Sequence, residues 1–207
     1  MNCANYQKKS IVLALTGASG MPYARRLLQR LLAHGVCVYL LYSQAAQIVA
    51  QQECAWHLDN DIAKTNKDLC KEFNTTPQQL IVVERNDWFS RLASGSAFTD
   101  AMVVCPASMG TVAAIANGLS DNLIERAADV CLKEKKPLII VPRETPLSLI
   151  HLRNLTHLAE AGASILPPAP AFYHHPQTVD DMINFVVARI LNHLQIDETN
   201  AVKWGCE

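Results

Sequence analysis

Short apolar runs alternate with segments of helical periodicity along most of the chain. Continuous apolar runs are typical of strands buried on both faces, and they fall at 10–16, 36–42, 80–83, 101–105, 137–141 and 163–166. Apolar spacing and capping residues predict helices between them, over 24–32, from Ser43, over 63–73, 108–117 and 122–135, and from Thr145 with Pro146 in the first turn. We therefore expect a three-layer, doubly wound α/β fold, Rossmann-like or flavodoxin-like, with a mainly parallel sheet.

A last long helix is predicted from Thr178, where Asp181 completes a capping-box-like pair and a core stripe runs from Val179 to Leu194. The sequence contains no internal repeat, low-complexity segment or linker. We expect a single domain over residues 1–207, with its core at about 10–195 and a C-terminal tail over 196–207.

The amino-acid composition excludes several classes of function. The 207 residues include 18 Lys and Arg against 19 Asp and Glu, and this balance argues against a nucleic-acid or membrane-surface partner. The apolar runs are too short to span a bilayer, and the polar first ten residues lack a signal-peptide core, so we expect a cytoplasmic protein. The seven cysteines are odd in number and form no C-x-x-C pair, which favours buried thiols over zinc or disulfides.

Ligands of doubly wound sheets bind at the carboxyl ends of the strands, so the loops there carry the candidate chemistry. The segment 16–20, Thr-Gly-Ala-Ser-Gly, joins the first strand to a helix. Its glycines and small residues are compatible with an anion-binding loop or with an ordinary turn between a strand and a helix. NAD(P) fits poorly because Tyr23 replaces the third glycine of a dinucleotide fingerprint and Tyr42 is followed by no acidic residue. A single phosphate, as in FMN, fits better. A second small-residue loop at 105–111 opens another predicted helix.

Several basic side chains suggest that the protein binds a second anionic group. Arg126 and Lys133 are seven residues apart on one predicted helix, and Arg143 follows a strand end. Each could equally be a solvated surface residue. Tyr173 sits in a stiff proline-rich segment, where it is either a core-edge aromatic or a side chain held ready for a ligand. The histidines show neither metal-ligand spacing nor a Ser-His-Asp arrangement.

Five stretches, at 16–20, 106–109, 126–134, 142–147 and 167–173, occur together in an order and spacing that resemble the flavin prenyltransferases (UbiX-like), within the flavin-binding cysteine decarboxylase superfamily. The resemblance covers about residues 10–195. It implies a metal-independent enzyme that alkylates reduced FMN at N5 and C6 with dimethylallyl monophosphate and supplies prenylated FMN to a UbiD-type decarboxylase, often in ubiquinone biosynthesis. It also implies a homo-oligomer, commonly a dodecamer, with active sites at subunit contacts.

The resemblance also implies roles for single residues. The flavin contacts would be Gly17, Ala18, Ser19, Ser43, Ser108, Met109, Gly110, Thr111 and Arg143. Tyr173, Arg189 and Lys133 would hold the prenyl phosphate, with Arg126 and Glu53 beside them. Glu144 would assist proton transfer, Trp88 would cover the prenyl group, and Trp204 is a second candidate for that covering role. The catalytic set is therefore expected to be Ser19, Glu53, Trp88, Arg126, Lys133 and Glu144.

Two residues depart from the family pattern, Ala107 where many members have cysteine and His175 where arginine is common. One alternative is an FMN-dependent decarboxylase of the peptidyl-cysteine type, whose loop would need Ala-Asn where this chain has Met109 and Gly110. Another is a non-catalytic FMN carrier, which would need only one phosphate site.

Overall fold

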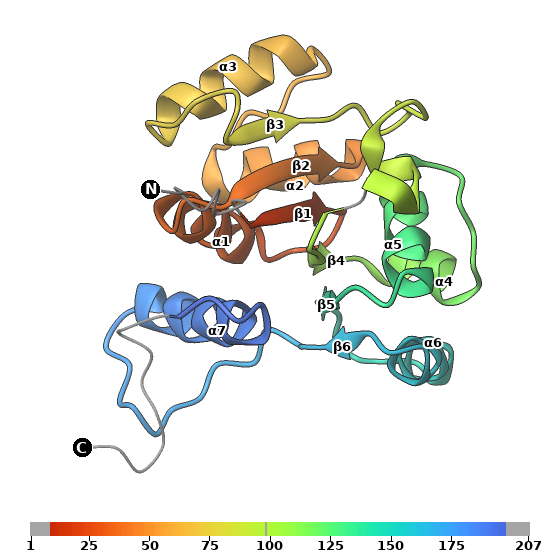
Figure 1. The fold of residues 1–207 in the computed structure, drawn as a ribbon. Helices are drawn as coiled ribbons and strands as arrows, with labels where there is room; N and C mark the ends of the chain where they lie inside the picture. Colours follow the sequence, from red (N-terminus) through yellow and green to blue (C-terminus); the bar gives the residue numbers. More distant parts are fainter. Residues whose placement is uncertain (1–8, 98, 198–207) are drawn as a thin grey trace, which may run out of the picture.

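The computed structural model describes residues 9–97 and 99–197, which contain one six-stranded sheet in the order β3-β2-β1-β4-β5-β6 (Figure 1). Every strand pair is parallel. The strands are β1 Ser10–Leu15, β2 Cys37–Tyr42, β3 Leu80–Val82, β4 Ala101–Ala107, β5 Leu138–Pro142 and β6 Ser164–Ile165. This is the Rossmann strand order, and the chain reverses direction across the sheet between β1 and β4. The doubly wound parallel fold and all six predicted strands are confirmed.

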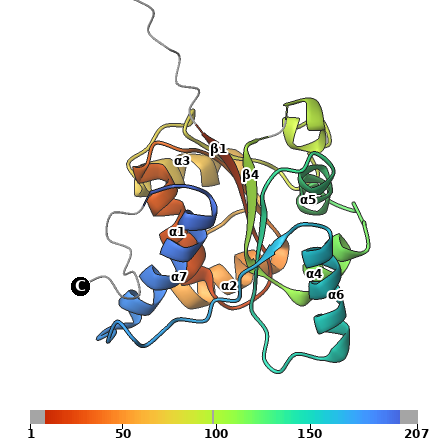
Figure 2. The same cartoon turned by 60° about the horizontal axis from the view of Figure 1, so that its bottom comes forward.

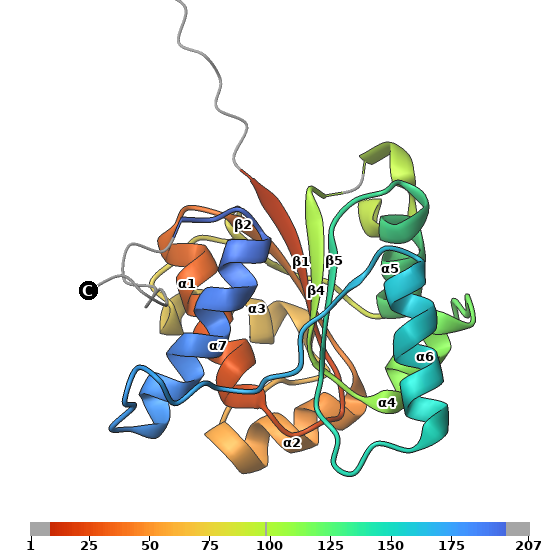
Figure 3. The same cartoon turned by 90° about the horizontal axis from the view of Figure 1, so that it is seen from below.

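Helices cover both faces of the sheet (Figures 1 and 3). One face carries α1 Met21–Ala33, α2 Gln44–Cys54, α3 Ile62–Glu72 and α7 Val179–His193. The other carries α4 Met109–Ala116, α5 Leu123–Lys133 and α6 Leu149–Glu160, together with the short helix η1 Arg91–Ala93, which is followed by η2 Gly95–Ala97. Side chains of β1 alternate between the two cores, Ile11 and Leu13 facing the first and Val12 and Ala14 the second. Burial on both faces explains the continuous apolar runs of the sequence.

The predicted start of α6 is wrong by about one turn. Ser148, not Thr145, caps this helix: its hydroxyl accepts from the backbone N–H of His151, and His151 Nδ1 accepts from the N–H of Ser148. Thr145 and Pro146 lie in the preceding loop and are joined by a cis peptide bond. The reciprocal Ser148–His151 pair gives two backbone N–H groups a hydrogen-bond acceptor, whereas a single threonine cap would satisfy only one.

The capping box of α7 is confirmed at Thr178 and Asp181, but Val179 is 72% exposed and does not belong to the core stripe. Cys105 and Cys131 are buried, as expected of packing thiols, and burial raises the pKa of each thiol to about 12. Cys3, Cys206 and Trp204 lie outside the described residues. Among the described helices, none is long and apolar enough to cross a membrane.

Candidate active site

The loops after β1 and β4 meet at the point where the strand order reverses, and Thr16 fastens them together. The buried Thr16 hydroxyl donates to the carbonyl of Pro106 at 2.8 Å and accepts from the backbone N–H of Ser108 at 2.7 Å. The backbone N–H of Thr16 also donates to Pro106. Thr16 was missing from the site residues expected from sequence, although a lone hydroxyl at the end of an apolar strand was a usable signal.

Two glycines shape the turn between β1 and α1. A Cβ at Gly17 would lie 2.4 Å from Cβ of Ala45, so the backbone of this turn runs directly against the first turn of α2. Gly20 has a φ of 119°, a left-handed conformation that side chains rarely adopt. Gly17 is therefore required for the close packing of this turn against Ala45 on α2.

The helices α1, α2 and α4 each begin at this edge of the sheet (Figure 3). Ser43 caps α2 by accepting from the N–H of Ala46, and Ser108 caps α4 by accepting from the N–H of Thr111. The Ser108 and Thr111 hydroxyls lie 3.1 Å apart. The first amides of a helix have no partner inside that helix, and its dipole favours negative charge there. The α2 and α4 ends therefore form a cradle suited to an anion.

The N-terminus of α1 already holds an anion from the chain itself. The Glu53 carboxylate, at the end of α2, accepts from the backbone N–H groups of Gly20 at 2.8 Å and Met21 at 2.9 Å. Partial burial alone would raise the pKa of Glu53, but hydrogen bonds from Ser19, Gly20 and Met21 and the charge of Arg143 lower it overall. Arg143 Nε in turn donates to the carbonyl of Ser19 at 3.3 Å.

Within one chain, Glu53 lies at the turn after β1 and apart from Arg126 and Lys133. Its hydrogen bonds join it to the turn after β1. Arg126 and Lys133, by contrast, lie on α5, across the sheet from α2. Glu53 thus belongs with Ser19 and Arg143.

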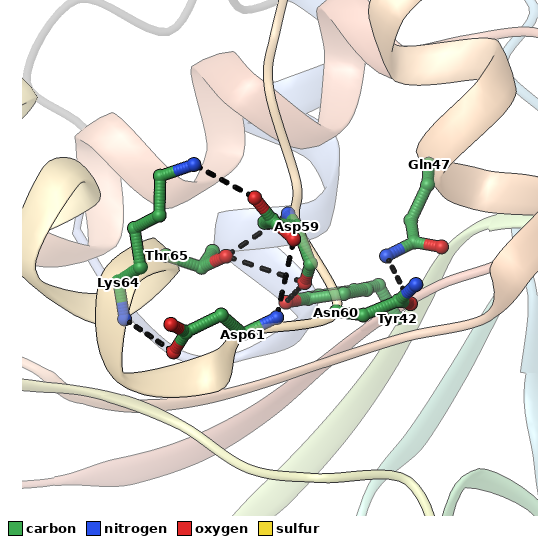
Figure 4. A network of polar contacts seen from close by, with 7 residues as sticks. All are labelled: Tyr42, Gln47, Asp59, Asn60, Asp61, Lys64 and Thr65. Atoms are coloured by element: carbon green, nitrogen blue, oxygen red, sulfur yellow. Dashed lines mark hydrogen bonds and ion pairs between the residues drawn. The ribbon is translucent and has the colours of Figure 1, made fainter.

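A polar network braces the loop between α2 and α3, behind this edge (Figure 4). Tyr42 at the end of β2 donates its hydroxyl hydrogen to the carbonyl of Asp59 at 2.6 Å. Asp59 pairs with Lys64 on α3 at 2.8 Å, and Gln47 on α2 donates to Asn60 at 3.0 Å. The network fixes the end of this loop that leads into α3, and it joins that end to Tyr42 at the end of β2 and to Gln47 on α2.

The other predicted cations and Tyr173 do not converge within one chain. Arg126 pairs with Asp129 and donates to the carbonyl of Ala93, and Lys133 pairs with Glu134, all on the α5 side of the sheet. Tyr173 and Arg189 belong to α7 and the segment before it, on the opposite side (Figures 2 and 3). Within the described chain, Arg126 and Lys133 therefore lie across the sheet from Tyr173 and Arg189.

Two further candidates, Glu144 and Trp88, lie on exposed loops. Glu144 follows Arg143 directly after β5, and its carboxylate accepts from the N–H of Thr145 at 3.1 Å. Trp88 lies in the segment between β3 and η1 and is 47% exposed. Among the described residues there is no group of three His, Cys, Asp or Glu side chains that could hold a metal ion.

The chain resembles known flavoproteins over almost its whole length. The model of the Flavoprotein family matches residues 2–191. The flavin prenyltransferase UbiX of Pseudomonas aeruginosa is 48% identical over 195 residues, which cover 94% of this chain and 93% of that protein. The solved structure of AnUbiX (PadA1) in complex with FMN and dimethylallyl pyrophosphate is 36% identical, with a TM-score of 0.86 over 97% of this chain and 100% of the other.

A third similar protein is a dodecameric FMN-dependent UbiX-like decarboxylase from Escherichia coli O157:H7. It is 37% identical, with a TM-score of 0.84 over 95% of this chain and 100% of the other. A Rossmann-order sheet with an anion cradle at its switch point defines the class as a nucleotide-binding or flavin-binding α/β protein. The chain belongs to the flavoprotein family and, within it, to the flavin prenyltransferases.

Proposed function

We propose that this protein joins the dimethylallyl group of dimethylallyl monophosphate to N5 and C6 of reduced FMN, and that the prenylated FMN serves a UbiD-type decarboxylase. The observation that carries the proposal is the crevice between β1 and β4, where Ser43, Ser108 and Arg143 surround a glycine turn. The near-full-length identity to flavin prenyltransferases supports the same activity.

The described residues fit a flavin mononucleotide. The α2 and α4 cradle suits one phosphate, and Glu53 keeps that phosphate away from α1 because its own carboxylate fills the α1 end. Gly110 leaves open space where a Cβ would stand, so a ligand can approach the α4 backbone closely. In the proposed complex Gly17, Ala18, Ser19, Ser43, Ser108, Met109, Gly110, Thr111 and Arg143 contact the flavin.

We assign the prenyl phosphate to Lys133, Arg126, Tyr173 and Arg189, contributed by neighbouring copies of the chain in a homo-oligomer. Lys133 ends α5, which leads into β5, so Lys133 lies toward the edge of the sheet opposite the crevice. A residue in that position reaches a flavin crevice only from another subunit. Dodecameric assembly, as named for the similar Escherichia coli protein, would supply such neighbours.

In the proposed reaction the protein stabilises the charges that develop on the departing phosphate and on the allylic group. Reduced FMN supplies the nucleophile, so the reaction needs none from a side chain of the protein. Lys133 and Arg126 stabilise the departing phosphate, and Trp88 presents an aromatic face that stabilises the allylic cation by about 1–2 kcal/mol when desolvated. Glu144, on the exposed loop beside Arg143, assists proton transfer, and Ser19 and Glu53 hold the turn against the flavin.

The test is anaerobic incubation of the purified protein with reduced FMN and dimethylallyl monophosphate, with the diphosphate as a second arm. We expect mass spectrometry to find a flavin heavier by one five-carbon unit. Recovery of unmodified FMN alone, while a known prenyltransferase is active in the same assay, would overturn the proposal. Product formed faster from the diphosphate would change the assigned substrate and leave the reaction class intact.

The alternatives receive less support. A peptidyl-cysteine-type decarboxylase would need Ala-Asn in place of Met109 and Gly110 at the start of α4, and a carrier of FMN would have no use for Lys133 and Tyr173. We further propose that the whole chain is one flavin-binding domain acting in the cytoplasm, without metal, nucleic acid or membrane as partner.

A further inference from the structure

A tight turn carries Tyr173, and hydrogen bonds fasten it to the start of α7. The backbone N–H of His175 donates to the carbonyl of Phe172 at 2.9 Å, which makes Tyr173 and His174 the central residues of a β-turn. Gln177 donates from its side chain to the carbonyl of His175, and Asp181 of the α7 capping box accepts from the N–H of Gln177 at 3.0 Å. These hydrogen bonds therefore hold the turn against the start of α7.

Three aromatic rings pack together at this turn. His174 stacks on Phe185 of α7, with ring centroids 5.1 Å apart and planes only 6° from parallel. Tyr173 meets both rings edge-on, at 5.7 Å and 76° to His174 and at 5.9 Å and 82° to Phe185. Phe185 packs against the hydrophobic core of the α1 and α7 face. A continuous line of ring contacts thus connects Tyr173 to the rigid interior through His174 and Phe185.

The packing of its ring, not hydrogen bonding, fixes His174. Both imidazole nitrogens are buried and have no hydrogen-bond partner. An unpaired buried polar atom disfavours the folded state, so nothing about those nitrogens explains why the side chain stays in this place. The stacked contact with Phe185 does explain it, because parallel and edge-on aromatic pairs are favourable beyond simple burial.

We propose that His174 is a positioning residue that sets the place of the Tyr173 ring, and thereby the affinity of the site for the prenyl phosphate. The inference deepens the proposed function and rests on the assignment of Tyr173 to that phosphate. Tyr173 is 39% exposed, and its ring packs edge-on against the rings of His174 and Phe185. A ring held before binding loses less conformational entropy when the ligand arrives, and this raises affinity without a new contact.

The experiment distinguishes the effect of the His174 ring from the effect of its nitrogen atoms. In the full-length protein, His174→Ala should raise the KM for dimethylallyl monophosphate about tenfold while kcat and FMN affinity stay near wild type, because two ring contacts are lost. His174→Phe keeps a ring that can stack and should restore the KM. The matched control is His157→Ala, an exposed histidine on α6 across the sheet. In a Tyr173→Ala background, His174→Ala should add nothing.

Calorimetry on protein loaded with oxidised FMN gives a readout that needs no turnover. The Kd of dimethylallyl monophosphate should rise in His174→Ala and recover in His174→Phe. If wild type binds this ligand with that pattern yet forms no prenylated flavin, the proposed reaction fails and the positioning role stands. An unchanged Kd in His174→Ala, equal impairment in His174→Phe, or absence of binding by wild type would each overturn the positioning role.

Discussion

The flavin crevice and the residues assigned to the prenyl phosphate are assembled in different ways. Several of the residues assigned to the flavin are brought together within one chain, because Thr16 joins the loops after β1 and β4 and Arg143 reaches the carbonyl of Ser19 from beyond β5. The phosphate residues are split by the sheet itself, with Lys133 on α5 and Tyr173 beside α7 on opposite faces (Figure 3).

The difference follows from topology. Parallel strands bring their carboxyl ends to one edge, so loops distant in sequence become neighbours there without any partner. Helices on opposite faces of a sheet never meet in that way. We therefore expect one subunit to bind flavin alone, whereas prenyl transfer requires contacts between subunits.

The largest effect should come from mixing two inactive variants. Arg143→Ala damages the flavin crevice and Lys133→Ala damages the phosphate site, so each alone should lose most activity. Coexpressed, they should recover roughly a quarter of wild-type activity, because random assembly pairs an intact crevice with an intact Lys133 in about one site in four. The measurement is prenylated FMN formed per mole of protein.

A second pair of variants controls this experiment. Arg143→Ala coexpressed with Gly17→Val should stay inactive, since both changes lie in the same crevice. Recovery in this pair, or its absence in the first pair, would contradict a site shared between subunits.

The next largest effect should come from Lys133 on α5, where a substitution should reduce prenyl transfer without reducing flavin binding. Lys133→Ala should lower kcat/KM by about a hundredfold or more, because a charge that stabilises the departing phosphate is removed. FMN retention should stay at the wild-type level. Lys136→Ala, a nearby exposed lysine beyond the end of α5, is the matched control and should leave both quantities unchanged. Loss of FMN from the Lys133 variant would place this residue at the crevice instead.

The fold was predictable because its signals are local. Apolar runs identified all six strands, and Ser43, Ser108 and the Thr178–Asp181 pair marked helix starts that the structure confirms. The start of α6 was not predictable in this way, because Thr145 and Ser148 are both capping residues and the choice depends on the reciprocal bonds with His151.

The candidate site was predictable only in part. The glycine turn and the small-residue loop stood out in sequence, but their connection through Thr16 depends on pairing between β1 and β4. The position of Glu53 was also hidden, since its contact with Gly20 and Met21 spans more than thirty residues. Charge spacing placed Arg126 and Lys133 on one helix correctly, yet it carries no information about which face of the sheet that helix covers.

A smaller effect should follow from filling the space at Gly17. Gly17→Ala puts a Cβ 2.4 Å from Cβ of Ala45 and should lower the free energy of unfolding by about 2 kcal/mol, which corresponds to roughly 4–8 °C in Tm. FMN affinity should fall as well. Ala45→Gly in the same chain removes the clashing atom and should restore both. A double variant as impaired as the single would show that Gly17 is needed for flavin approach independently of Ala45.

The smallest effect concerns the charge of Glu53, measured as urea unfolding of wild type and Glu53→Gln at several pH values. Hydrogen bonds and Arg143 hold the pKa of Glu53 below its ordinary value of 4.5, so its ionised form stabilises the folded state above that pH, and this contribution disappears as the pH falls through the lowered pKa. Because the carboxylate is largely exposed, we expect wild type to exceed the variant by less than about 1 kcal/mol at pH 7. The difference should vanish in acid. A difference that persists at a pH well below the lowered pKa of Glu53 would mean that Glu53 acts by shape and not by charge.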